Sequence, residues 1–325
     1  MKVIEIQAPG GPEVLQLAER PDPVPQAGEV LIRVQAAGLN RADLLQRQGK
    51  YPPPPGAPEW PGMEVAGRVI ACGPGVHEFE PGDSVCALVS GGGYAESCIA
   101  PVAQTLPIPK GLDAVAAAAI PEAAFTVWNN IFDICRVSPG ESVLVHGGSS
   151  GIGVMALQLL SAFGHTVLTT AGTAAKCRAC EALGASRAIN YNDENFVTVV
   201  RQTLGDKGVD VILDMVGGDY IARDLDCIAD GGRICVIATQ RGSRTTVNLA
   251  QLMRRQVILT GSTLRSRPVA YKERIKAALL VHVWPLIEQA RIRPVIDRTF
   301  ALRDAALAHA AMERGEHIGK IILTC

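Results

Sequence analysis

The chain has 325 residues, 48% of them hydrophobic, and its 31 basic side chains nearly balance 32 acidic ones. This composition suits a soluble globular protein of about two domains, and a net charge of -1 gives no overall attraction to nucleic acid or an anionic membrane. The longest hydrophobic stretches, residues 114–120 and 277–287, are shorter than the ~20 residues that cross a bilayer. Because the N-terminal MKVIEIQ alternates like a strand and not like a signal peptide, we expect a cytoplasmic protein.

The nine cysteines are scattered from Cys72 to Cys325 and are typical of reduced thiols, not of a disulfide framework. Cys177 and Cys180 form a CxxC pair inside the helix-like run AAKCRACEAL. Ordinary helix packing is favoured there over a zinc or redox role, because no second Cys/His pair stands at zinc-finger spacing. The six histidines are widely separated, so the sequence indicates no metal ligands.

The first 110 or so residues are rich in Gly and Pro and carry short β-like runs, at residues 30–36, 64–71 and 84–89. They predict an irregular, mostly antiparallel β domain. Residues 51–62 hold six prolines in YPPPPGAPEWPG, which favours a stiff extended loop. Such a loop forms either one wall of a pocket or a rigid surface connector.

After Pro121 the pattern changes to alternating buried strands and helices. The predicted strands start near Ser142, Thr166, Arg187, Val209, Arg233 and Val257. This spacing predicts repeated strand-helix units in a doubly wound parallel sheet, and hence an α/β protein. A predicted amphipathic helix over residues 270–290 and the strand-like IGKIILT follow, and we expect this tail to return to the first domain. The predicted domains are residues 1–120 with 264–325, and residues 121–263.

The segment ESVLVHGGSSGIGVMALQLL combines a strand, a Gly/Ser turn and a helix, the context in which a glycine motif binds a dinucleotide pyrophosphate. Gly148, Ser150 and Gly153 fall on the three glycine positions of the G-x-G-x-x-G pattern, with serine at the second. The Ser150 hydroxyl would either donate to a phosphate or crowd it. A tight turn without a ligand is the alternative interpretation.

The end of the next strand indicates which dinucleotide is bound. NAD-binding proteins carry an acid there for the ribose 2′-hydroxyl, but this chain reads TTAGTAAKCR and its first carboxylate is Glu181. Without the acid a 2′-phosphate is not repelled, and Lys176 would attract it, so we predict NADPH over NADH. If Lys176 is only a solvated helix residue, cofactor preference stays open.

Together these features resemble the zinc-free medium-chain dehydrogenases/reductases, in particular the quinone oxidoreductases of the zeta-crystallin type. The resemblance spans the chain and rests on GGPEVL, GEVLIRVQAAGLNRADLLQRQGKYPPPPGAP, PGMEVAGRV, AAAAIPEAAFTVW, HGGSSGIG and the terminal GKIIL. The NRADLLQRQG run and Tyr51 look closest to the stress-inducible animal branch and its bacterial relatives. The resemblance implies a GroES-like, mostly β catalytic domain and a Rossmann-type cofactor domain.

The resemblance also implies that no metal is bound. Zinc relatives place a cysteine ligand where this chain reads Gly38-Leu39-Asn40, and a histidine ligand, within GHE, where it reads Gly62-Met63-Glu64. Their four-cysteine lobe is missing here. Without a Lewis acid, hydride delivery to an acceptor that is already electrophilic is the expected chemistry.

The family's sites transfer to this chain residue by residue. The resemblance implies that Tyr51 and Asn40 flank the nicotinamide and the acceptor, and it implies that Tyr51, Asn40 and Ser150 are catalytic. It implies cofactor contacts by Thr126, Ser149, Ser150, Gly151, Ile152, Gly172, Lys176, Tyr191, Val216, Gly217, Thr239, Leu264, Arg265 and Lys320. Simpler roles are open for several of them: Asn40 or Asp43 as a cap of a turn or helix, and Tyr51 as a cover of apolar surface.

The resulting hypothesis places NADPH across a cleft between the domains, where it reduces a quinone by hydride or by single electrons. Reduction of α,β-unsaturated ketones or enoyl thioesters is an alternative with the same cofactor geometry. A short-chain dehydrogenase is set aside, because no tyrosine is followed by lysine four residues later. The family's dimers suggest a homodimer formed along the VILTG strand.

A non-catalytic NADPH- or RNA-binding protein is the alternative from another class. Residues 241–267 hold six arginines and no acid. A solvated or subunit-facing edge, with contacts to cofactor phosphates, is favoured over RNA binding.

Overall fold

The computed structural model describes residues 1–325 and divides the chain into two compact units. The first unit contains Met1–Phe125 and Arg265–Cys325, and the second contains Thr126–Leu264. The first is built mostly on antiparallel strands and the second on a parallel sheet, so the predicted α/β class is confirmed. The predicted domain boundaries lie close to these limits. No helix is long and apolar enough to cross a membrane.

The first unit is centred on β3 (Glu29–Gly38). Val30, Ile32 and Val34 are buried whereas Arg33 and Gln35 are exposed, which is the alternation of a strand with one face on a core. Its seven-stranded sheet has the order β14-β15-β3-β4-β5-β7, with β6 also paired to β3. The other strands are β4 (Glu64–Cys72), β5 (Ser84–Leu88), β6 (Ser97–Pro101), β7 (Thr105–Pro107), β14 (Ile296–Ala301) and β15 (Lys320–Thr324), and β1 (Lys2–Ile6) pairs with β2 (Leu15–Glu19) in a separate sheet.

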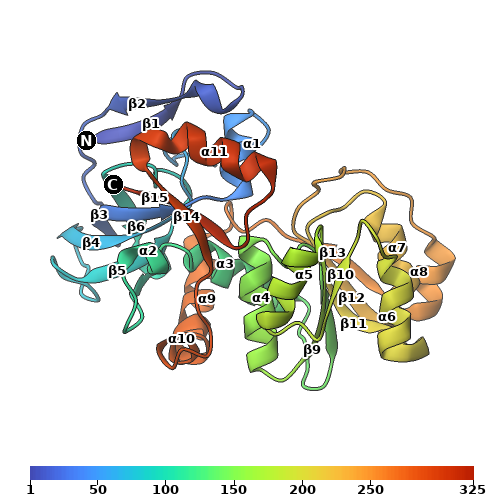
Figure 1. Cartoon of the computed structure of the whole chain (residues 1–325). Coiled ribbons are helices and arrows are strands. Elements are labelled where there is room, and N and C mark those ends of the chain that lie inside the picture. The colour runs from blue at the N-terminus through green and yellow to red at the C-terminus, as the bar shows by residue number, and fades with distance from the viewer. The chain divides into compact units, whose positions relative to one another are not determined.

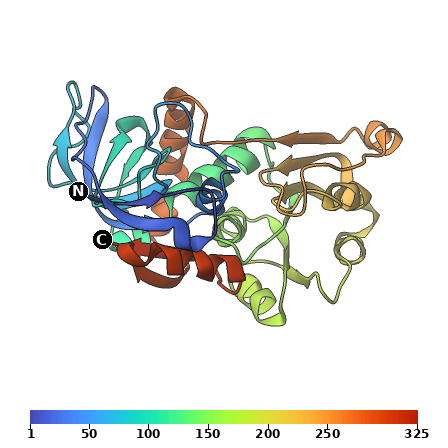
Figure 2. The ribbon, with the colours of Figure 1, turned by 90° about the horizontal axis from the view of Figure 1, so that it is seen from above.

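The C-terminal segment completes the first unit. β15 pairs antiparallel with β3, so that Ile322 lies opposite Gly38 and Leu323 opposite Ala37. Helix α11 (Ala305–Arg314), in red, lies beside the blue N-terminal strands in Figures 1 and 2. Residues almost 300 positions apart in the sequence are therefore neighbours here, as expected for a tail that returns to the first unit.

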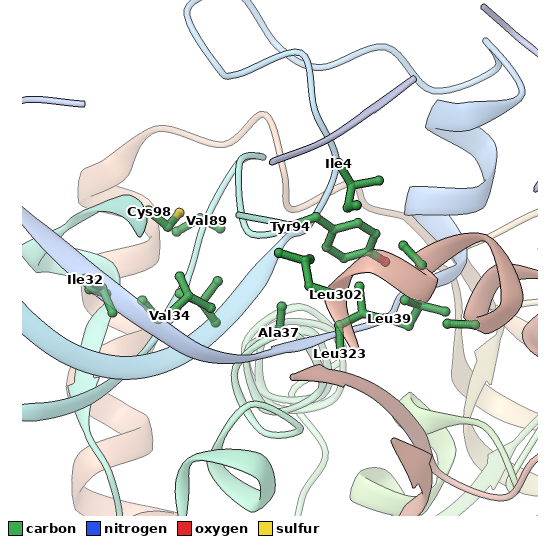
Figure 3. Packing of buried hydrophobic residues seen from close by; sticks show 14 of the residues in the cluster. Ile4, Ile32, Val34, Ala37, Leu39, Val89, Tyr94, Cys98, Leu302 and Leu323 are labelled. Carbon is green, nitrogen blue, oxygen red and sulfur yellow. The ribbon is translucent and has the colours of Figure 1, made fainter. Parts of the chain in front are cut away.

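The core of this unit mixes apolar side chains with one buried polar group. Figure 3 shows Tyr94 among Ile4, Leu39, Leu302 and Leu323, which come from both ends of the chain. Because Tyr94 is fully buried, its hydroxyl needs internal hydrogen-bond partners. Those partners belong to the candidate site described below.

The second unit contains a six-stranded parallel sheet of order β10-β9-β8-β11-β12-β13. Its strands are β8 (Ser142–Val145), β9 (Thr166–Ala171), β10 (Arg187–Asn190), β11 (Val209–Asp214), β12 (Ile228–Val236) and β13 (Ile258–Gly261). The chain winds outward from β8 to β10, returns to β11 and winds the other way. Ligands of such sheets bind at the carboxyl ends of the strands, where this direction reverses. That point lies between β8 and β11.

Helices cover this sheet, and in Figure 1 α4 and α5 lie on one side of the strands while α6, α7 and α8 lie on the other. Their bounds are α4 (Gly151–Ala162), α5 (Ala174–Ala182), α6 (Phe196–Leu204), α7 (Tyr220–Cys227) and α8 (Leu249–Arg255). In α6, Phe196, Val199 and Val200 share one face and are buried against the sheet, and the Asn195 side chain caps the N-terminus. The predicted doubly wound arrangement is therefore present.

The remaining helices show one departure from expectation. The single helix predicted over residues 270–290 is wrong, because the segment forms α9 (Val269–His282) and α10 (Trp284–Glu288) with a break at Val283. Pro285 explains the break, since it has no N–H to continue the hydrogen-bond ladder of α9. The shorter helices are α1 (Arg41–Arg47), α2 (Ala114–Ala117) and α3 (Pro121–Val127), followed by a π-helical turn (Trp128–Ile134).

Candidate functional site

The predicted phosphate loop connects β8 to α4. Ser150 caps α4: its Oγ accepts a hydrogen bond from the N–H of Gly153 at 3.0 Å. A Cβ on Gly148 would lie 2.1 Å from Oγ1 of Thr169, and one on Gly153 would lie 2.4 Å from the carbonyl oxygen of Gly147. The loop therefore tolerates only glycine at these two positions. The N–H groups of Gly147, Gly148, Ser150 and Gly153 are bonded internally, which leaves those of Ser149, Gly151 and Ile152 for a ligand at the start of a 12-residue helix.

A buried polar network lies directly below this loop and was not predicted from sequence. His146 is fully buried, with Nε2 at 2.9 Å from Oδ1 of Asp224 and Nδ1 at 3.1 Å from Oγ1 of Thr170. The same Thr170 oxygen accepts the N–H of Gly147 at 3.2 Å. Burial raises the pKa of Asp224, and its bond to His146 opposes that rise. The network links β8, β9 and α7 and fixes the first residue of the loop.

The residues predicted to select the dinucleotide follow β9 and β10. Gly172 comes directly after β9, and a Cβ there would lie 2.5 Å from the hydroxyl of Tyr191. Asn192 donates from Nδ2 to the carbonyl oxygen of Gly172 at 2.7 Å, and the Thr173 side chain caps α5, which carries Lys176. The strand end thus presents a small residue and a nearby cation but no carboxylate, which fits a 2′-phosphate.

The other predicted cofactor residues of this unit are distributed as follows. Val216 and Gly217 follow β11, and Asp214 accepts the N–H of Gly217 at 3.1 Å. Thr239 follows β12. Parallel strands end at one edge of the sheet, so these residues share that edge with Ser149, Ser150, Gly151, Ile152, Gly172 and Tyr191. Thr126 and Leu264 are buried at the two limits of the unit. The edge fits a dinucleotide.

In the first unit, Asn40 belongs to a buried polar cluster at the start of α1. The Lys320 ammonium donates to the carbonyl oxygen of Leu39 at 2.8 Å, to Oδ1 of Asn40 at 2.7 Å and to Oε1 of Glu64 at 2.5 Å. Asn40 in turn donates from Nδ2 to the same Glu64 oxygen at 2.9 Å. All three N–H groups of Lys320 are thus used, and a cofactor phosphate would have to displace one of these acceptors. The expected contact of Lys320 with the cofactor is not favoured by this geometry.

A second buried chain of hydrogen bonds ends at Asp43. Oδ2 of Asp43 accepts the N–H of Asn40 at 2.8 Å and faces the Tyr94 hydroxyl at 3.3 Å, while Oδ1 accepts the N–H of Gly62 at 2.9 Å. The Tyr94 hydroxyl lies 3.2 Å from Nε2 of His309, whose Nδ1 lies 3.3 Å from an Arg47 nitrogen. Sequence reasoning saw Asp43 only as a helix cap, and it missed Glu64, Tyr94 and His309.

The donor and acceptor roles along these hydrogen bonds follow from the chemistry of the side chains. Arg47 can only donate, so Nδ1 of His309 accepts and Nε2 carries the proton that goes to Tyr94. The Tyr94 hydroxyl then donates to Asp43. Burial raises the pKa of Asp43 to about 6, opposed by the two backbone N–H groups and by the Arg265 and Lys320 charges. Burial and the Arg47 charge lower the pKa of His309 to about 3.

Tyr51 opens the proline-rich loop and is half-buried in the first unit. The Arg265 guanidinium carbon lies 5.4 Å from the centroid of its ring. Burial and the Glu122 charge raise the pKa of Tyr51, and the Arg265 charge opposes that rise. Arg265 itself belongs to the first unit, in its C-terminal part Arg265–Cys325, and not to the second unit that carries the other cofactor residues. The predicted residues Tyr51, Asn40, Arg265 and Lys320 thus all lie in the first unit.

The arginine-rich segment and the CxxC pair of the sequence are separate features of the structure. The arginines of residues 241–267 do not form one patch: Arg265 is buried, Arg255 donates to the carbonyl oxygen of Ile228 at 2.7 Å, and Arg241 lies 3.9 Å from Asp219. Cys177 and Cys180 are buried on α5. No group of three or more His, Cys, Asp or Glu side chains is placed to hold a metal ion.

Comparison with known proteins agrees with both units. Residues 26–110 match the alcohol dehydrogenase GroES-like domain, and residues 183–323 match the zinc-binding dehydrogenase family. The quinone oxidoreductase of Rattus norvegicus is 35% identical over 326 residues, covering 99% of this chain and 97% of the relative. The solved structure of Escherichia coli quinone oxidoreductase complexed with NADPH has a TM-score of 0.90 at 29% identity, and an NAD-dependent alcohol dehydrogenase has 0.89 at 33%, each covering 100% of both chains.

The GroES-like first unit, the doubly wound second unit and the dinucleotide edge define a medium-chain dehydrogenase/reductase. Within that superfamily, the full-length identity shows that the chain belongs to the quinone oxidoreductase family. The predicted family is therefore confirmed, and the protein is an oxidoreductase.

Proposed function

We propose that this protein is an NADPH-dependent reductase of quinones. The observation that carries the cofactor choice is the end of β9, where Gly172, Lys176 and Tyr191 stand without a carboxylate. The E. coli relative complexed with NADPH supports the same choice. The acceptor is proposed to bind in the first unit, near Tyr51 and Asn40. Tyr51 offers its hydroxyl to a carbonyl oxygen. The two N–H groups of the Asn40 amide already donate to the carbonyl oxygen of Gly38 at 3.4 Å and to Glu64 at 2.9 Å, so Asn40 shapes the site and is not a free donor.

Bound NADPH supplies a hydride, and the protein's residues bind, orient and exclude water. The N–H groups of Ser149, Gly151 and Ile152 hold the pyrophosphate, while the His146 network keeps the loop in place. Lys320 and Glu64 fix the Asn40 side chain in a single orientation. The Tyr51 hydroxyl is protonated near neutral pH, since its ordinary pKa is 10.0 and burial raises it further, so it can donate to a developing negative charge.

Steady-state assays with a panel of acceptors test this function. NADPH oxidation should be driven by 1,2-naphthoquinone and related quinones, with the hydroquinone as product. Enones and enoyl thioesters belong in the same panel, since they would use the same cofactor edge. Turnover of these compounds without any quinone would assign the alternative reaction, and no turnover with any quinone counts against the proposal.

The NADPH preference has its own test at Lys176. Replacing this residue with alanine removes the cation next to the 2′-phosphate, so the KM for NADPH should rise while that for NADH stays the same. Arg178→Ala is the matched control, because Arg178 is an exposed cation on the same helix. An unchanged NADPH preference in Lys176→Ala would refute the assignment.

We also propose that the protein is a homodimer formed along β13. This strand is the last of its sheet, and Ile258 and Leu259 on it are 55% and 37% exposed. An exposed apolar edge strand invites pairing with a second copy across a two-fold axis. Sedimentation should show a dimer at micromolar concentration and a monomer for Ile258→Lys. A wild-type monomer contradicts the proposal.

A further inference from the structure

Arg265 is a buried cation with an incomplete set of partners. Arg265 is only 8% exposed. Nε donates to the carbonyl oxygen of Ser90 at 2.8 Å, and Nη2 donates to Oε1 of Gln46 at 2.7 Å. The third nitrogen, Nη1, is buried and has no hydrogen-bond partner. A buried donor of an ionised group is normally satisfied, so this nitrogen indicates a missing acceptor.

The charge of Arg265 is also unpaired. No carboxylate lies within 4.0 Å of its guanidinium, the limit for an ion pair. The nearest acids act only from a distance: Asp43 is already held by Asn40, Gly62 and Tyr94, and Glu122 contributes a weaker attraction. Lys272 adds a second cation, since its Nζ donates to the Arg265 carbonyl oxygen at 2.9 Å. The surroundings therefore favour a ligand that carries negative charge.

The guanidinium is held rigidly and next to the proposed acceptor site. Ser90 and Gln46 fix two of its nitrogens, and a planar fork held in this way keeps the third in a defined place. The Tyr51 ring lies alongside at 5.4 Å. A lysine at this position would carry its three N–H groups on one nitrogen, so it could not span the two separated anchors in the way that the guanidinium does.

We propose that Arg265 binds the oxygen of the acceptor on which negative charge develops, with Nη1 as the donor. The inference rests on the proposed function and names the class of ligand that this site takes: an aryl oxyanion. A quinone that accepts a hydride becomes a hydroquinone monoanion, while NADPH becomes NADP⁺. One proton then completes the hydroquinone. Arg265 stabilises the monoanion through Nη1, and the Tyr51 hydroxyl is the second donor.

This role differs from the cofactor contact expected for Arg265 from sequence. A cofactor residue would affect the KM for NADPH, whereas an oxyanion donor affects the acceptor and the product. In Arg265→Met, kcat/KM for a quinone should fall at least tenfold, and the KM for NADPH should stay within twofold of wild type. A rise in the KM for NADPH with unchanged quinone kinetics would overturn the inference.

A binding experiment tests the site without turnover. 4-Nitrocatechol is a coloured catechol whose absorption distinguishes the phenol from the phenolate, and it resembles a hydroquinone product. Titrated into the full-length protein saturated with NADP⁺, it should bind as the phenolate, so that its visible band grows at constant pH. Arg265→Met should remove this spectral change and weaken binding at least tenfold, and Arg265→Lys should recover only part of it.

The controls separate a local effect from a loss of structure. Arg267→Met removes an exposed arginine two residues away, so it should bind 4-nitrocatechol as wild type does. If Arg265→Met does not fold, Gln46→Leu removes one anchor of the guanidinium and should weaken binding in the same direction. Equal phenolate binding by wild type and by the folded variants overturns the inference.

The two proposals can also be told apart. Arg265-dependent binding of 4-nitrocatechol without turnover of any quinone would leave the oxyanion site standing and remove the quinone reductase. Quinone turnover with phenolate binding that is independent of Arg265 would do the reverse.

Discussion

At the scale of single residues, the buried cluster around Lys320 determines how Asn40 is presented. Lys320 is 4% exposed and Glu64 is fully buried, so both charges have left water. Such a pair adds little net stability over an apolar pair of similar size, but removing one partner leaves the other charge unpaired. The cluster therefore serves orientation more than stability.

Substitutions at this pair should show that asymmetry. Lys320→Met alone should lower the free energy of unfolding by about 3–5 kcal/mol, because Glu64 is left without its cation. The double variant Lys320→Met with Glu64→Leu should recover much of the loss. Urea unfolding of wild type, Lys320→Met, Glu64→Leu and the double variant measures the coupling. Equal losses in the single and double variants would show that the charges do not depend on each other.

The low pKa of His309 predicts a specific dependence of stability on pH. Its value of about 3 in the folded protein lies below the ordinary 6.5, so between these values the unfolded chain binds more protons at this residue. The stabilising contribution is present above pH 6.5 and is lost as the pH falls toward 3. His309→Gln should lack this contribution, whose slope is at most about 1.4 kcal/mol per pH unit.

The measurement compares urea unfolding of wild type and His309→Gln between pH 4 and 7. Asp43 contributes the opposite slope, because its raised pKa makes ionisation costly as the pH rises from 3.8 to about 6. Asp43 is present in both proteins, so its effect largely cancels in the difference. Parallel stability curves would contradict the prediction, because they would mean that His309 binds protons equally in the folded and unfolded protein.

At the scale of elements, the start of α4 depends on Ser150. Its hydroxyl caps the helix through the N–H of Gly153, so Ser150→Ala should lower the free energy of unfolding by about 0.5–2 kcal/mol. The KM for NADPH should rise with it, because the cap orders the first turn of α4, whose neighbouring N–H groups of Gly151 and Ile152 are proposed to hold the pyrophosphate. Thermal unfolding and cofactor kinetics measure the two effects.

The matched control for this cap is Ser161→Ala, an exposed serine near the other end of α4. It should change neither stability nor KM measurably. Ser150→Thr keeps a hydroxyl at the cap and should retain most of the stability. If Ser150→Ala lowers kcat without changing stability or KM, the hydroxyl acts in the reaction and not as a cap.

Element order was predictable where local patterns decide it. The apolar strand runs, spaced by helical segments, identified the parallel sheet, and the glycines and the missing acid located its dinucleotide edge. The break between α9 and α10 could be predicted only if Pro285 was given more weight than the apolar pattern that continues through it. The hydrogen-bond chain from Arg47 to Asp43 was beyond sequence reasoning, because His309 and Tyr94 meet only through pairing of distant segments.

At the scale of the whole molecule, the two units differ in how continuous they are. The second unit is a single stretch, Thr126–Leu264, whereas the first needs both ends of the chain. A fragment of residues 126–264 should therefore fold alone, with a cooperative thermal transition, and should bind NADPH. A fragment of residues 1–125 should not fold, because Glu64 and Tyr94 lose Lys320 and His309.

Circular dichroism and fluorescence of bound NADPH check both fragments. Adding a separately made fragment of residues 265–325 to residues 1–125 should restore structure, since it supplies β14, β15 and α11. A folded 1–125 fragment would show that the C-terminal strands are dispensable.

The pairing of Lys320 with Asn40 also has a consequence for synthesis. The two residues are 280 positions apart, so at about 5–20 residues per second roughly 15–60 s pass on the ribosome between them. During that time the N-terminal strands have been synthesised but β15, which pairs with β3, has not. The second unit is synthesised completely in this interval and is free to fold. Until then the Glu64 carboxylate lacks its cation and the side-chain oxygen of Asn40 lacks its donor. A growing chain of this design is most in need of chaperone protection before residue 320 emerges.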